Sequence, residues 1–128
     1  MTSFKIAIPA RYSSSRLPGK PLLLLAGRPM IAHVCEQAMR AGAEEVVVAT
    51  DDERIQAAAE AVGVQAFLTD PNHTSGTERI HEVAQRLGWG EEEIVVNWQG
   101  DEPLLDPELV SHLAHCLAGH PDAVMATL

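Results

Sequence analysis

The amino-acid sequence predicts a doubly wound α/β domain with a mostly parallel sheet. Short β-branched runs alternate five times with segments whose apolar residues recur at helical spacing. No linker or low-complexity stretch interrupts this alternation. Alternating strands and helices form parallel sheets with right-handed crossovers and helices on both faces. In such sheets ligands bind at the carboxyl ends of the strands, near the point where the strand order reverses.

The candidate strands are five short runs rich in valine, isoleucine and alanine: Phe4–Ile8, Glu45–Thr50, Val64–Leu68, Ile94–Trp98 and Ala123–Leu128. Stripes of apolar residues between them have the period of helices buried on one side. The first three stripes are Met30, Ile31, Val34, Cys35, Ala38 and Met39; Ile55, Ala58, Ala59 and Val62; and Ile80, Val83, Ala84 and Leu87. A fourth stripe, Leu109, Leu113, Cys116 and Leu117, follows a helix start at Asp106 and Pro107.

Composition favours a compact globular domain, because 128 residues with 46% hydrophobic content can bury a substantial core. Nine basic and eighteen acidic residues give a net charge of -9, which disfavours binding to nucleic acid. Two cysteines in apolar helical segments favour reduced, packed thiols. The sequence shows no signal-peptide pattern and no apolar run near the ~20 residues that span a bilayer. We therefore expect a soluble, cytoplasmic protein that binds neither membranes nor nucleic acid.

The segment Ile8–Leu22 is the strongest functional signal, because it gathers phosphate-binding groups directly after the first candidate strand. It reads IPARYSSSRLPGKPL, with cations at Arg11, Arg16 and Lys20, hydroxyl groups at 13–15 and a glycine that permits close approach of the main chain. The spacing excludes a Walker loop, and no G-x-G-x-x-G follows the strand. A solvated surface loop has a similar composition, so composition alone leaves both interpretations open.

Asp101 is the candidate ligand for Mg²⁺. The stretch NWQGDEP, at 97–103, leaves a candidate strand and turns at Gly100 into adjacent carboxylates. A carboxylate at the carboxyl end of a strand can hold Mg²⁺ while the ion bridges substrate phosphates. Glu102 alternates to the other side of an extended backbone, so we do not expect both to bind one ion. The alternative is an aspartate that stabilises the turn.

The stretch HTSGTER, at 73–79, opens the third candidate helix. Ser75 and Glu78 match the S-x-x-E capping box, which explains two of its residues without a ligand. The free amides of a helix start, with Gly76 and Thr77, are also suited to contact a base or sugar, and Arg79 is suited to face an anion. Helix capping is expected in either case, and ligand contact is an addition to it.

Two further clusters favour structural over catalytic interpretations. Thr50 and Glu53 match a capping box before an alanine-rich helix, which we favour over a metal site in the same acidic stretch. His112, His115 and Cys116 do not all share one helical face and no second ligand cluster accompanies them, which disfavours zinc. No Ser-His-Asp order or Cys-His pair supports covalent catalysis.

In this order, the segments IPARYSSSRLPGKPL, GRPMIAHV, VVVATDD, HTSGTER and VNWQGDEP resemble the N-terminal half of the 3-deoxy-manno-octulosonate cytidylyltransferase (CMP-Kdo synthetase) family. The resemblance covers essentially the whole chain. The CMP-sialic acid synthetases share the R-x-x-S-x-R-L-P-x-K style of loop, but the linked H-x-S-G-T-E-R and Q-G-D-E-P segments point to the Kdo enzyme.

The resemblance implies a nucleotide-diphospho-sugar transferase-like, Rossmann-like fold and a reaction in which CTP and Kdo give CMP-Kdo and pyrophosphate. Mg²⁺ would be the cofactor and lipopolysaccharide synthesis the purpose. By similarity, Arg11, Lys20 and Asp101 would be catalytic, and Asp101 would bind the metal. The residues that contact CTP would be Ala10, Arg11, Ser14, Arg16, Lys20, Ser75, Gly76, Arg79 and Gln99.

The chains of this family are longer than the present one, so the resemblance predicts that residues 1–128 form a single nucleotide-binding α/β domain, the N-terminal half of a longer chain. The second half would supply most Kdo contacts, a second Mg²⁺ ligand and the interface of a homodimer. The alternatives are a CMP-sugar-acid synthetase of the sialic acid type, an inactive CTP-binding fragment and a structural phosphate-binding module.

Overall fold

The computed structural model describes residues 4–12, 19–70, 72–73, 76–90, 94–98, 108 and 125–127. Within them the chain forms, in order, β1 (Lys5–Ala10), the short 3₁₀ helix η1 (Lys20–Leu22), β2 (Leu24–Leu25), β3 (Arg28–Pro29), α1 (Met30–Met39), β4 (Glu45–Thr50), α2 (Glu53–Ala61), β5 (Gln65–Leu68), α3 (Gly76–Leu87), β6 (Val95–Asn97) and β7 (Met125–Thr127). None of the described helices is long and apolar enough to cross a membrane.

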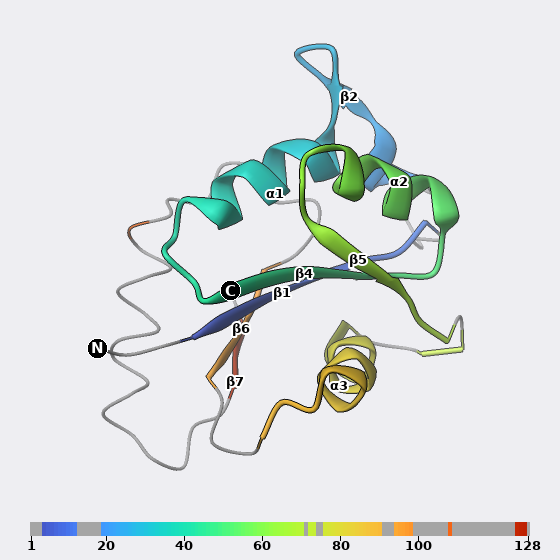
Figure 1. The fold of residues 1–128 in the computed structure, drawn as a ribbon. Coiled ribbons are helices and arrows are strands. Elements are labelled where there is room, and N and C mark those ends of the chain that lie inside the picture. The colour runs from blue at the N-terminus through green and yellow to red at the C-terminus, as the bar shows by residue number, and fades with distance from the viewer. Residues whose placement is uncertain are drawn as a thin grey trace.

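The main sheet has five strands in the order β5-β4-β1-β6-β7, and every neighbouring pair is parallel. The chain builds outward from β1 to β5, then returns to place β6 on the other side of β1 (Figure 1). This order confirms the predicted doubly wound sheet. The strand order therefore reverses between β1 and β6, and ligands in such folds bind beyond the carboxyl ends of the strands there.

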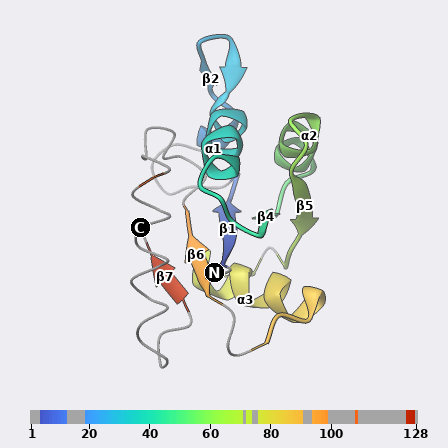
Figure 2. The same ribbon diagram turned by 60° about the vertical axis from the view of Figure 1, so that its left-hand side comes forward.

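Helices cover both faces of this sheet, with α1 and α2 on one side and α3 on the other (Figure 2). Alternate residues of β1 serve the two cores, because successive side chains of a strand point to opposite faces. Ile6 and Ile8 pack in the core formed with α1 and α2, which includes Val34. Ala7 packs in the smaller core with Val83 of α3. β1 therefore lies between the two helical layers, which flank the carboxyl edge of the sheet where a ligand is expected.

The observed strands agree closely with the predicted runs, but β1 continues to Ala10 rather than ending at Ile8. The additional residues pair with β4, where Ala10 lies opposite Thr50. The short hairpin of β2 and β3 was not predicted from the sequence, and its turn places both Ala26 and Gly27 at positive φ. The predicted last helix, beginning at Asp106, lies outside the described residues apart from the helical Glu108.

The capping box predicted for Thr50 and Glu53 is wrong in its residues. Asp52 is the N-cap of α2, and its side chain accepts a hydrogen bond from the backbone N–H of Arg54. Thr50 is the last residue of β4 and fully buried, because β1 and β5 both pair with it, and its hydroxyl accepts from the N–H of Asp52. Strand pairing therefore overrides the local capping pattern.

Candidate functional site

The candidate site lies at the carboxyl edge of the sheet, where the segments after β1, β4 and β5 meet the start of α3. Of the residues predicted from the sequence, the structure describes Ala10, Arg11, Lys20, Gly76 and Arg79. Ser14, Arg16, Ser75, Gln99 and Asp101 lie outside the described residues, as does the Ser75 half of the predicted capping box. The described part of the candidate site therefore consists of these five residues and their neighbours.

The candidate phosphate loop begins and ends in defined structure. Ala10 is buried at the end of β1, whereas Arg11 is exposed directly beyond it. Lys20 opens the helix η1 and is half-buried. The backbone N–H of Tyr12 donates to Asp51 Oδ1 at 3.1 Å, so the residue after β4 orients the chain as it leaves β1. Arg11 and Lys20, the two predicted cations that the structure describes in this loop, thus lie at the carboxyl edge of the sheet.

Arg79 is fully buried although it carries a guanidinium group. One nitrogen, Nη1, donates to Thr69 Oγ1 and, at 3.4 Å, to the carbonyl oxygen of Asp70. Among the residues that the structure describes, no group accepts a hydrogen bond from Nε or Nη2. Buried donors without acceptors are costly and rare in proteins. The geometry therefore favours a ligand that supplies acceptors to Arg79.

Electrostatics bring Arg79 into one group with Arg11 and Asp51. Burial lowers the pKa of Arg79; the negative charge of Asp51 opposes this effect and the positive charge of Arg11 adds to it. The three charges come from the end of β1, the end of β4 and the first turns of α3. The carboxylates of Glu82 and Asp70 also act on Arg79, so the feature that suits an anionic or polar ligand is the pair of Arg79 nitrogens without acceptors among the described residues, rather than net charge.

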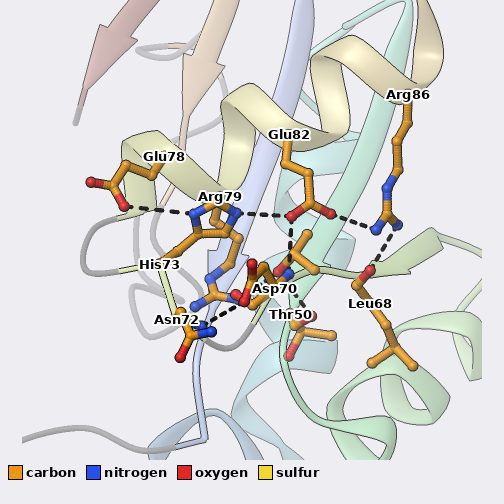
Figure 3. A network of polar contacts seen from close by, with 10 residues as sticks. Thr50, Leu68, Asp70, Asn72, His73, Glu78, Arg79, Glu82 and Arg86 are labelled. Atoms are coloured by element: carbon orange, nitrogen blue, oxygen red, sulfur yellow. Dashed lines mark hydrogen bonds and ion pairs between the residues drawn. The ribbon is translucent and has the colours of Figure 1, made fainter.

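A polar network holds the segment that leads from β5 into α3 (Figure 3). Glu82 Oε1 accepts from the backbone N–H of Asp70 at 2.9 Å and lies 2.8 Å from Nε2 of His73. Arg86 pairs with Glu82 and donates to the carbonyl oxygen of Leu68 at 2.7 Å. Glu82 and Arg86 thereby connect α3 to the backbone of Asp70 and Leu68 and to the side chain of His73. These contacts fix the segment beside Arg79.

The network also shifts the titration of its carboxylate. Burial acts to raise the pKa of Glu82, but the hydrogen bonds from the Asp70 N–H and His73, together with the charge of Arg86, hold it below its ordinary value. Glu82 therefore remains a charged acceptor at neutral pH. This role was not predicted from the sequence, because Glu82 belongs to no motif and only its helical spacing from Glu78 and Arg86 indicates it.

The described groups at this edge are suited to binding phosphates and a polar base. Among the described residues no group of three or more His, Cys, Asp or Glu side chains could hold a metal ion. Cys35 is buried, and burial raises the pKa of its thiol to about 12, as expected for a packed, unreactive cysteine. Tyr12, two residues after β1, was not predicted as a site residue, and Asp51, directly after β4, was considered only as part of a disfavoured metal site.

The chain matches the family model described as cytidylyltransferase over residues 6–128. It is 60% identical over 126 residues to the 3-deoxy-manno-octulosonate cytidylyltransferase of Thioalkalivibrio sulfidiphilus, covering 98% of this chain and 50% of the relative. The protein of the same name from Methylococcus capsulatus is 58% identical, with 98% and 49% covered. The chain thus spans about half the length of these curated relatives.

Solved structures show the same relationship. A structure of CMP:2-keto-3-deoxy-manno-octonic acid synthetase complexed with CTP is 49% identical and has a TM-score of 0.83, covering 93% of this chain and 49% of that one. A cytidylyltransferase from Leptospira borgpetersenii is 26% identical with a TM-score of 0.80, covering 94% and 50%. These likenesses agree with the resemblance on which the sequence prediction rests.

Proposed function

Because this chain belongs to the cytidylyltransferase family, we propose that it is the nucleotide-binding half of an enzyme that joins CTP to Kdo. The products are CMP-Kdo and pyrophosphate, for lipopolysaccharide synthesis. In this proposal residues 1–128 form one domain, the N-terminal half of a protein that is cytoplasmic and homodimeric when complete. The observation that carries the proposal is the 49% identity and TM-score of 0.83 to the synthetase solved with CTP.

The described geometry supports a nucleotide at the carboxyl edge of the sheet. Arg79 has two buried nitrogen donors that lack acceptors within the described part of the chain, and a cytidine offers carbonyl, ring-nitrogen and ribose acceptors. Gly76 is the first residue of α3, so its N–H belongs to the first turn, where backbone donors lack helical partners. Arg79 and Gly76, with Ser75 and Gln99, form the proposed cytidine pocket, next to Ala10.

The catalytic residues act on the phosphates. The anomeric hydroxyl of Kdo attacks the α-phosphorus, the bond from that phosphorus to the bridging oxygen breaks, and negative charge develops on the departing pyrophosphate. Arg11 and Lys20, with Ser14 and Arg16 of the same loop, stabilise this charge through fixed cations and hydrogen bonds. Holding the triphosphate in line for attack supplies much of the remaining rate enhancement.

The proposed cofactor is Mg²⁺, with Asp101 as its ligand in this chain. Asp101 lies outside the described residues, but Asn97 ends β6 beside β1, at the reversal of strand order that the substrate phosphates would occupy. A carboxylate oxygen there has the donor chemistry that Mg²⁺ prefers. When bound, the ion neutralises phosphate charge and helps to orient the triphosphate.

Thermal unfolding with Mg²⁺ and CTP, UTP or ATP tests the nucleotide site, because a ligand that binds only the folded state raises its stability by mass action. We expect CTP to raise the melting temperature more than UTP or ATP. Equal shifts would indicate a general phosphate-binding module and refute a cytidine pocket. Pyrophosphate release with Kdo or sialic acid then tests the reaction, and release with sialic acid alone would contradict the Kdo assignment.

The second candidate is a chain that binds CTP without turnover. It is favoured by the fact that the chain spans about half the length of its curated relatives. It predicts a CTP-selective rise in melting temperature but no pyrophosphate release with either sugar acid. Restored release after addition of the second half of a relative would assign the chemistry to the assembled protein.

A further inference from the structure

The two ends of the candidate phosphate loop are joined directly. The backbone N–H of Gly19 donates to the carbonyl oxygen of Tyr12 at 2.6 Å. Gly19 has φ +75°, and a Cβ atom placed on it would lie 2.9 Å from Cε2 of the Tyr12 ring. The glycine therefore provides both the left-handed backbone and the space that this junction needs. We call Tyr12 and Gly19 the loop neck.

The Tyr12 ring has a second partner, Arg54. The guanidinium carbon of Arg54 lies 4.1 Å from the centroid of the ring, within the range of a cation–π contact. Arg54 is itself held by Asp52, which accepts from Nε at 3.1 Å and from Nη2 at 2.9 Å. Asp52 is in turn fixed as the N-cap of α2. A rigid helix start therefore supports the loop neck through one arginine.

We propose that Tyr12 and Arg54 are positioning residues that hold the loop neck, so that the adjacent cations Arg11 and Lys20 face the triphosphate in one arrangement. This inference rests on the proposed function. Asp51 completes the arrangement by accepting from the Tyr12 N–H, so strand β4 and helix α2 both hold this residue. Arg54 is not expected to contact the nucleotide itself.

Arg54 acts through geometry rather than through its charge. Its side chain is 61% exposed, and Asp52 balances its charge within a paired fork. A paired, solvated cation adds little to the attraction of a distant anion. A misplacement of about 1 Å by a residue outside the chemistry can cost about a hundredfold in rate, so geometry is the larger effect. The helix remains anchored without Arg54, because Ile55 and Ala59 bury its other side.

Calorimetric titration of wild type, Arg54→Ala, Arg54→Lys and Tyr12→Ala with CTP, CMP and tripolyphosphate tests the proposal. We expect the three variants to lose about tenfold or more in affinity for CTP and tripolyphosphate, and less than about threefold for CMP. Tyr12→Phe retains the ring but removes the hydroxyl that also interacts with Arg54, and is expected to lose less affinity than Tyr12→Ala. Arg40→Ala removes an exposed arginine at the end of α1, whose side chain donates to Gln37, and is the matched control.

Three results would overturn the proposal. CTP affinity within threefold of wild type in Arg54→Ala excludes a positioning role. An Arg54→Lys variant that matches wild type shows that charge, and not the planar fork, matters. Equal losses for CMP and CTP indicate a general structural effect, which the melting temperatures of the variants would also register. If the wild-type protein binds tripolyphosphate without preferring CTP, only the proposed function is contradicted. If it binds neither CTP nor tripolyphosphate, both the proposed function and the positioning role are contradicted.

Discussion

The two edges of the sheet each bury a cation, but they treat it differently. At the amino edge, Lys5 begins β1, is 5% exposed and lies 3.0 Å from the carboxylate of Glu44. Its ammonium also lies 6.0 Å from the centroid of the Trp89 ring. At the carboxyl edge, Arg79 is 0% exposed, and two of its nitrogens lack acceptors within the described part of the chain.

We infer from this difference that Lys5 serves the fold, whereas Arg79 is prepared for a ligand. Lys5 has its charge compensated within the protein, so the amino edge is complete by itself. Arg79 has two donors without acceptors among the described residues, and although Asp51, Glu82 and Asp70 oppose the effect of burial, its pKa stays below the ordinary value. A buried charge of this kind costs stability in the free protein, and a bound anion or polar base can recover that cost.

The largest expected effect comes from Arg79→Met, which keeps the volume and removes the donors. We expect CTP affinity to fall about a hundredfold, because loss of one partner in a buried charged contact costs about 2–5 kcal/mol. Stability should be unchanged or higher, since the variant removes unsatisfied buried nitrogens. Calorimetry and urea unfolding measure the two quantities. A large loss of stability with CTP affinity unchanged would show that Arg79 is a structural cation.

Cys35 is a third buried titratable group and, unlike Lys5 and Arg79, it is neutral in the folded protein. Its pKa is about 12 when folded against 9.0 as the reference, so the unfolded chain loses its proton first as pH rises. Stability is therefore expected to fall as pH rises from 9.0 toward about 12. Urea unfolding across this interval, in a Cys116→Ser background, measures the effect. The same fall in a chain that also carries Cys35→Ala would assign it to other groups.

Glu82→Gln tests whether the carboxylate network supports the ligand-binding edge. We expect a loss of about 1–3 kcal/mol in stability at neutral pH, because Gln cannot serve His73, Arg86 and the Asp70 N–H equally. Since the folded pKa lies below the reference of 4.5, the advantage of Glu82 is present above 4.5 and disappears as pH falls through the folded value. Urea unfolding at a series of acidic pH values measures this. A difference between the two proteins that does not change with pH would contradict the account.

The smallest effect is expected for Lys5→Met at the opposite edge. Glu44 is 57% exposed and returns to water when its partner is removed, so stability should change by about 1 kcal/mol or less. CTP affinity should stay at the wild-type value, because the substitution lies at the far end of β1. The same calorimetry used for Arg79→Met provides the comparison, and a matching loss of affinity would remove the distinction between the edges.

The sequence predicted the sheet well because its strands are short, continuous runs of β-branched and small apolar residues, which is typical of strands buried on both faces. The bounds of β4 agree with the predicted run, and the reversal between β1 and β6 follows the predicted architecture. The predictions that failed concern residues whose structural partners are distant in the sequence. Thr50 is drawn into the sheet by two neighbouring strands, so Asp52 replaces it as the N-cap.

The candidate site was only partly predictable for the same reason. The motif indicated Arg79 as a ligand residue, but neither its complete burial nor its unmatched donors follow from HTSGTER alone. Glu82 and Arg54 act across helices and loops through contacts that no local pattern encodes. The predictions for Ser14, Arg16, Ser75, Gln99 and Asp101 lie outside the described residues and stay predictions.

The most direct test of the central claim is NMR spectroscopy of the guanidinium Nε–H groups in ¹⁵N-arginine-labelled protein, with and without CTP and Mg²⁺. Arg79→Met identifies the Arg79 resonance by its absence. We predict that CTP shifts this resonance and slows its exchange with water, since the nucleotide then accepts its hydrogen bonds. A resonance that is unchanged in a sample saturated with CTP, as shown by calorimetry, would contradict the claim that Arg79 is prepared for the nucleotide.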